Sequence, residues 1–95
     1  MLVNRRTFIV KPGHLEEAIE LLKAEVTRVW PSMPVRYYRE HIAPSDTGAF
    51  EAEFESLAAY EKAMAEGWPR VSAEYLEKWN QLAEAGGTNE FWELV

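Results

Sequence analysis

The sequence predicts an α+β fold in which helices cover one face of an antiparallel sheet. Three observations lead to this expectation. Apolar and polar residues alternate in short β-rich segments, apolar residues recur every three or four positions in the segments between them, and turn-forming residues separate the two kinds of segment. The 95 residues suffice for one domain over residues 1–95, and they contain neither an internal repeat nor a linker.

The first third of the chain predicts a strand followed by a helix. Residues 2–10 mix β-branched and aromatic side chains, and the Lys-Pro-Gly sequence at 11–13 is typical of a turn. Over 14–29 the apolar residues recur at steps of three and four with charged residues between them, which indicates an amphipathic helix. Pro31 and Pro34 end this helix, because proline lacks an amide donor and restricts the residue before it.

The next segments predict a hairpin. A strand is expected over 35–42, followed by turn-forming residues at 43–48 and a second strand around 50–54. In this second strand the phenylalanines and Ala52 point to one side, while the glutamates point to the other. The apolar side should pack under helices.

Two helices and a strand complete the predicted order. Ser56 is a suitable N-cap for a helix that ends at Gly67, where we expect a left-handed residue. Pro69 suits the first turn of a further helix, whose buried side includes Trp79, and residues 89–95 predict a final strand. The order β-α-β-β-α-α-β is the split βαβ arrangement of ferredoxin-like folds, in which a four-stranded antiparallel sheet has one face without helices.

Composition excludes several classes of site and partner. The chain has no cysteine, and therefore neither a disulfide nor a cysteine-based metal site. Its 16 acidic and 10 basic residues give a net charge of -6 without a basic cluster, which argues against nucleic acid as the partner. No apolar run approaches the roughly 20 residues that span a bilayer, and the first ten residues lack the apolar core of a signal peptide. We therefore expect a cytoplasmic protein with no membrane partner.

The open face of the sheet is predicted to bind a second copy of the chain. Neighbouring residues of a strand point to opposite faces, so each face receives one of Arg5 and Arg6 and one of Tyr37 and Tyr38. An exposed face with aromatic and oppositely charged side chains is a candidate for burial against an identical sheet. There a two-fold axis can set an arginine against a glutamate such as Glu51. We expect a homodimer through the sheet face.

Three groups of residues lie in an order and spacing that match a known family. They are residues 6–8 with 10–13 (RTF and VKPG), 53–60 (EFESLAAY) and 90–94 (EFWEL). Together they resemble the NIPSNAP-like branch of the dimeric α+β barrel superfamily. The resemblance implies a ferredoxin-like subunit that pairs through its sheet, with a small-molecule pocket between sheet and helices. Similar subunits serve as cofactor-free monooxygenases, isomerases, haem-handling enzymes and proteins of unknown role, so the fold does not select an activity.

His41 is the candidate for proton transfer, because imidazole titrates near neutral pH. It has the same strand parity as Tyr37, so His41 can orient or deprotonate an acidic organic substrate with Tyr37 as hydrogen-bond partner, if that face looks into the pocket. The alternative is a half-exposed histidine at the rim of the hairpin. His14 and Glu17 are spaced for a metal pair, but two ligands do not make a zinc site, and no pattern marks a haem ligand. We expect no metal and no cofactor.

Arg6, Tyr38 and Trp79 are the candidate ligand-binding residues. Aromatic side chains, with Tyr75 and Trp68 among them, can line a pocket for a flat or lipophilic ligand, and their polar atoms can orient it. Helical spacing explains Tyr75 and Trp79 equally well as core. Arg6 can bind a carboxylate or join an ion pair between subunits. Three functions remain open: binding of a small organic molecule, a cofactor-independent monooxygenase or isomerase that uses His41 and a tyrosine, and a protein-interaction module without an internal cavity.

Overall fold

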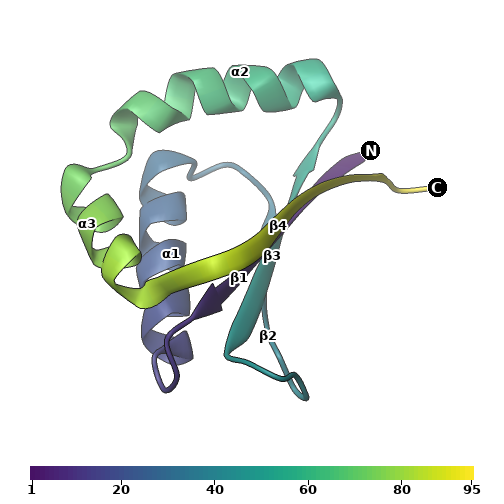
Figure 1. The fold of residues 1–95 in the computed structure, drawn as a ribbon. Coiled ribbons are helices and arrows are strands. Elements are labelled where there is room, and N and C mark those ends of the chain that lie inside the picture. Colours follow the sequence, from purple (N-terminus) through teal and green to yellow (C-terminus); the bar gives the residue numbers. More distant parts are fainter.

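In the computed structural model, which describes residues 1–95, the helices lie on one side of a four-stranded antiparallel sheet (Figure 1). The elements are β1 (Leu2–Val10), α1 (Leu15–Val29), β2 (Val35–Arg39), β3 (Thr47–Phe54), α2 (Leu57–Gly67), the short 3-10 helix η1 (Trp68–Arg70), α3 (Ala73–Leu82) and β4 (Ala83–Glu93). The strands lie in the order β2-β3-β1-β4. The predicted element order and the ferredoxin-like α+β class are confirmed.

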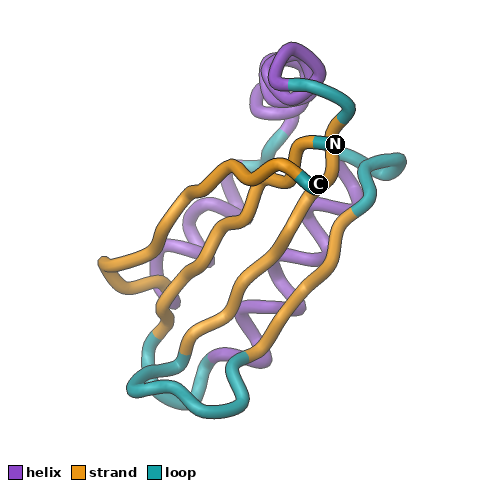
Figure 2. Tube along the Cα trace, turned by 90° about the vertical axis from the view of Figure 1, so that its right-hand side faces the viewer, coloured by secondary structure: helices purple, strands orange, loops and turns teal.

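One face of the sheet carries the core and the other is open. Figure 2 shows α1 and α3 behind the sheet, with α2 at the end of the sheet near the two chain termini. The buried apolar cluster comes from β1, α1 and the end of α3: Phe8, Val10, Leu15, Ala18, Leu22, Val26 and Leu82. No helix of the chain combines the length and the apolar character needed to cross a bilayer. The cytoplasmic location stays a prediction.

The pairing register decides which side chains share a face. Arg6 pairs with Phe50, and Phe50 pairs with Tyr37, so these three residues form one row on the helix-covered face. Arg5 and Tyr38 therefore lie on the open face. The sequence left this choice undecided for both neighbouring pairs.

Strand β2 ends at Arg39, three residues before the predicted end at 42. The amide of Glu40 still donates to the carbonyl of Thr47 over 3.0 Å, and the chain then leaves the sheet. Pro44 in the connecting loop has no amide hydrogen and cannot extend the ladder. His41 consequently lies in an exposed loop and not on a strand.

The prediction of a left-handed Gly67 is wrong, because its φ is -88°. Glycine is needed there for space, since a Cβ atom at this position would overlap the indole of Trp30. Pro69 lies in the 3-10 helix rather than in the following α-helix, which begins only at Ala73. Ser72 is the N-cap of α3, and its side chain accepts a hydrogen bond from the first turn of that helix.

Strand β4 begins at Ala83, six residues before the predicted start of the final strand. Its register with β1 shifts between Thr7 and Ile9, so the strand contains a bulge. Gly86 has a φ of +114°, a conformation that other residues rarely adopt. At Gly87 a Cβ atom would overlap the backbone oxygen of Thr7. The two glycines allow the strand to bend and begin earlier than the aromatic residues suggested.

Candidate functional site

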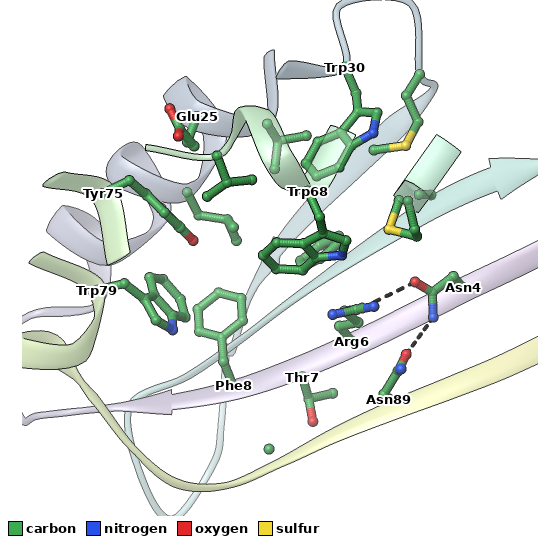
Figure 3. A pocket seen from close by; sticks show the side chains of 18 of the residues that line it. Asn4, Arg6, Thr7, Phe8, Glu25, Trp30, Trp68, Tyr75, Trp79 and Asn89 are labelled. Carbon is green, nitrogen blue, oxygen red and sulfur yellow. Dashed lines mark hydrogen bonds between the residues drawn. The ribbon is translucent and has the colours of Figure 1, made fainter. Parts of the chain in front are cut away.

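A cavity of about 300 Å³ lies between the sheet and the helices (Figure 3). Strands β1, β3 and β4 form one wall, and α1, α2, η1 and α3 contribute to the other. Of the 21 lining residues 14 are apolar or aromatic, so the interior suits an apolar ligand body. Seven aromatic side chains line the cavity: Phe8, Trp30, Phe50, Phe54, Trp68, Tyr75 and Trp79.

The aromatic side chains contact one another in defined geometries. The rings of Phe8 and Trp79 meet edge to face with their centroids 5.2 Å apart, and Trp79 stacks on Tyr75 at 6.0 Å. Trp30 and Trp68 meet edge to face at 6.2 Å. Such contacts fix the ring orientations, because each ring turns its positive edge or negative face to its neighbour. The cavity therefore presents flat, oriented surfaces to a ligand.

One corner of the cavity is polar. Asn4 is buried, and its Nδ2 donates to Oδ1 of Asn89 over 2.6 Å and to the carbonyl of Glu90 over 3.0 Å. Arg6 donates from Nε to Oδ1 of Asn4 over 3.2 Å and from an Nη to the hydroxyl of Tyr60 over 2.9 Å. Figure 3 shows Arg6 beside Asn4, beneath the indole of Trp68. These four side chains, Asn4, Arg6, Tyr60 and Asn89, are called the polar corner below.

A phenol faces the cavity from the other wall. In Figure 3 the ring of Tyr75 extends from α3 with its hydroxyl toward the cavity. Burial raises the pKa of Tyr75 to about 12, and the nearby charges of Glu25 and Tyr37 act in the same direction. The hydroxyl therefore stays protonated near neutral pH and can donate a hydrogen bond.

Glu25 lines the edge of the cavity but is bound to protein groups. Its two carboxylate oxygens accept from Arg28, each over 2.9 Å, and one also accepts from the amide of Ser72 over 2.7 Å. The hydrogen bonds from Arg28 lower the pKa of Glu25 to about 2, against the opposing effect of burial. Glu25 thus joins α1 to the start of α3 and is not poised to take a proton near neutral pH.

The structure brings together only part of the predicted site. Arg6 and Trp79 line the cavity. Tyr37 packs beside the core on the same sheet face, where burial raises its pKa, but it does not line the cavity. Tyr38 lies on the open face and donates to a carboxylate oxygen of Glu51 over 2.9 Å. The structure places His41 in its loop, outside the cavity.

Sequence reasoning missed two polar groups of the site, Asn4 and Asn89. The spacing of Asn4 and Arg6 by two in one strand was a usable signal, since it sets both side chains on one face. Tyr75 was among the aromatic residues expected to be able to line a pocket, with core packing as the alternative, and it does line the cavity. Asn89 carried no signal, because its pairing with β1 depends on the register of β4.

His14 and Glu17, whose spacing allows a metal pair, lie in contact with each other. Nδ1 of His14 lies 3.0 Å from a carboxylate oxygen of Glu17, and both side chains are exposed. No group of three or more His, Cys, Asp or Glu residues converges in the chain. A two-residue contact in the first turn of a helix is sufficiently explained as an exposed side-chain hydrogen bond.

Comparison with known proteins identifies the fold. No family model and no curated protein matches the sequence. Among solved structures, protein Atu4242 from Agrobacterium tumefaciens is 20% identical, with a TM-score of 0.81 over 100% of this chain and 94% of that one. An uncharacterized NIPSNAP-like domain protein from Burkholderia xenovorans is 17% identical, with a TM-score of 0.80 over 99% of this chain and 84% of that one.

A further match is described as an antibiotic biosynthesis monooxygenase. It is 21% identical, with a TM-score of 0.70 over 100% of this chain and 99% of that one. A second structure of Atu4242 is described as a nipsnap family protein with unknown function. Identities this low relate folds and not activities. The resemblance seen in the sequence is confirmed at this level: the chain has the ferredoxin-like α+β fold found in NIPSNAP family proteins.

Proposed function

We propose that this protein binds a small, largely apolar organic molecule in the cavity between its sheet and helices. The observation that carries the proposal is the cavity itself. Its volume of about 300 Å³ falls at the lower end of the range for small-ligand pockets, and its polar groups are few and localised. A solidly packed interior would have favoured a protein-interaction module, whereas an apolar cavity favours a small molecule.

The lining favours binding over acid–base catalysis. The cavity is lined by three titratable side chains, those of Arg6, Glu25 and Tyr75. The pKa of Glu25 is too low and that of Tyr75 too high for either to exchange a proton readily near pH 7. His41, the candidate base of a monooxygenase or isomerase, lies elsewhere. The monooxygenase named among the similar structures shares the fold, and at 21% identity its reaction is not carried over to this chain.

A neutral naphthalene probe is expected to stabilise the protein. A ligand that binds only the folded state at about 100 times its dissociation constant adds about 2.7 kcal/mol to the free energy of unfolding, and the midpoint of thermal unfolding should rise by several degrees. Val71→Phe places a larger side chain against the cavity and should abolish this rise without unfolding the protein.

The matched control for the cavity is His41→Ala, which lies outside it. This variant should respond to the probe as the wild type does. An equal response of Val71→Phe and wild type would place the probe somewhere other than the cavity, and no response of the wild type to any probe of this size would contradict the proposed function.

We also infer that two copies pair through the open face of the sheet. The face carries no helix, and Trp92 and Tyr38 are exposed on it, by 59% and 39%. The register sets Arg36, Glu51, Arg5 and Glu90 side by side in one row across the sheet.

Four charged residues of this face form ion pairs within their own sheet, whereas the sequence analysis expected an arginine of one copy against a glutamate of the other. Arg5 contacts Glu51 at 2.8 Å, and Arg36 contacts Glu53 at 3.7 Å. The contacts of Tyr38 and Arg5 lower the pKa of Glu51. Burial of the face against a second copy would thus keep Glu51 and Glu53 paired with arginines of their own subunit. The carboxylate of Glu90 accepts only from the indole of Trp92, over 2.8 Å, and Glu90 is the glutamate of this row that an arginine of the second copy could pair with.

Replacing Trp92 with lysine should weaken the dimer at least tenfold, because a large exposed aromatic side chain is the kind of residue that dominates interface energy. Light scattering after size-exclusion chromatography measures the mass directly. Leu94→Lys adds the same charge two residues further, beyond the end of β4, and should leave the dimer largely intact. A wild-type monomer at micromolar concentration would contradict the inference.

A further inference from the structure

We propose that the cavity is built for an aromatic acid that carries a second oxygen: the carboxylate binds Arg6 at the polar corner, and the second oxygen accepts a hydrogen bond from the hydroxyl of Tyr75. This inference rests on the proposed function, since it assigns a chemical class of ligand to the same cavity. It follows from the unmatched charge of Arg6, its free donors and the position of Tyr75.

Arg6 differs from the other arginines of the chain in its charge environment. Four of the six arginines lie within 4.0 Å of a carboxylate, in the pairs Arg5 with Glu51, Arg28 with Glu25, Arg36 with Glu53, and Arg39 with Glu16. Arg70 has no such pair, but it is exposed to water. Arg6 is half-buried in the wall of an apolar cavity and has no carboxylate partner. A partly desolvated cation without a counter-charge is unfavourable, and a ligand carboxylate would supply that charge.

The guanidinium of Arg6 is held in place with donors to spare. Of its five N–H groups, one is bound to Asn4 and one to Tyr60, so five minus two leaves three without a protein acceptor. Asn4 is itself held by Asn89. A guanidinium that is already oriented binds a carboxylate with two parallel hydrogen bonds and loses little further freedom.

Tyr75 offers a second polar contact across an aromatic space. The hydroxyl of Tyr75 forms no hydrogen bond within the protein. Tyr75 bonds to a side chain only through its backbone amide, which donates to Oγ of Ser72. The hydroxyl faces the cavity from α3, whereas Arg6 reaches the cavity from β1 (Figure 3). Phe8, Trp68 and Trp79 lie along the cavity and present ring surfaces to an aromatic ligand body.

The overall charge of the protein makes this preference specific. A net charge of -6 repels small anions in general, so an acid gains nothing from the average field of the molecule. A preference for the acid over a neutral ligand of the same shape must then come from a local cation. In the cavity that cation is Arg6.

Calorimetric titration with a matched pair of ligands tests the carboxylate contact. Naphthalene-2-carboxylate and naphthalene-2-carboxamide have the same shape and differ in charge. We expect the wild type to bind the acid at least about tenfold more tightly than the amide. Arg6→Gln should lose this preference and still bind the amide as before, which also shows that the variant is folded. Arg6→Lys, which keeps the charge but not the two parallel donors, should show an intermediate preference.

The neighbouring arginine is the matched control. Arg5→Gln removes the same charge from the next residue of the same strand but on the open face, so it should keep the full preference for the acid. For the second contact, 6-hydroxynaphthalene-2-carboxylate should bind the wild type more tightly than the unsubstituted acid. Tyr75→Phe should remove that gain, and Tyr38→Phe should not.

The outcomes separate the inference from the function on which it rests. If the acid and the amide bind equally, the inference is overturned while the cavity remains a binding site. The inference is also overturned if Arg5→Gln reduces the preference as much as Arg6→Gln does. If neither ligand binds the wild type, the proposed function itself fails.

Discussion

Gly67→Ala is expected to lower the free energy of unfolding by about 2 kcal/mol, although alanine is normally the better helix former by about 1 kcal/mol. Gly67 ends α2 with the ordinary helical φ of -88°, so no backbone strain opposes a side chain there. The obstacle is Trp30, whose indole occupies the place that a Cβ atom would take. Trp30 is further held by donation from Nε1 to the carbonyl of Ala63 over 2.8 Å.

Chemical denaturation measures this loss of stability. Two further variants separate the effect of helix propensity from the overlap with Trp30. Ala65→Gly in the exposed part of the same helix should cost about 1 kcal/mol and calibrates the helix propensity alone. Trp30→Leu replaces the indole ring that would be overlapped with a smaller side chain, so Gly67→Ala should cost much less in that background. If Gly67→Ala instead stabilised the protein, the indole of Trp30 would not be closely packed against residue 67, which would contradict this explanation. Since Trp30 lines the cavity, replacing Trp30 should also alter ligand affinity.

Glu25→Gln is expected to lower the free energy of unfolding at pH 7 by about 1 to 3 kcal/mol. The pKa of Glu25 is lowered from 4.5 to about 2 in the folded protein. A carboxyl whose pKa falls on folding contributes stability that is complete above its unfolded pKa and is lost as the pH falls through the folded value. The contribution of Glu25 is therefore present above about pH 4.5 and disappears toward about pH 2.

The pH dependence distinguishes Glu25 from other carboxyls. Denaturation curves at pH 7, 4.5 and 2 should show the difference between wild type and Glu25→Gln narrowing as the pH falls. Glu20→Gln changes an exposed carboxyl of the same helix and should stay close to the wild type at every pH. A constant difference between wild type and Glu25→Gln from pH 7 to 2 would mean that the lost packing of the side chain, and not its charge, causes the effect.

Much of the fold could be predicted because the helices and strands follow from the spacing of apolar residues within short segments. The steps of three and four over 14–29 and the alternation of 50–54 both correspond to observed elements. Boundaries were less predictable. Residues 40–42 follow strand-forming residues, but the backbone pairing between this segment and β3 ends at the hydrogen bond from Glu40 to Thr47. The point at which this pairing ends depends on both segments together.

The candidate site was predicted less completely for the same reason. Arg6 and Trp79 were singled out by residue type and do line the cavity, whereas His41 was singled out by type and does not. Residue type indicates what a side chain can do, but not which space it reaches. The contribution of Asn4 and Asn89 required knowledge of the space between sheet and helices.

The sequence by itself determined the α+β class, the order of the elements and the exclusion of disulfides and cysteine-based metal sites. These features depend on composition and on patterns within a few residues. Only the tertiary structure decided that Arg6 faces the cavity and Arg5 the open face, that Gly67 makes room for Trp30, and that Tyr75 looks across an apolar space toward the polar corner. The physical reason is that strand register and side-chain packing are contacts between distant segments, and a change of one residue in register exchanges the two faces of a strand.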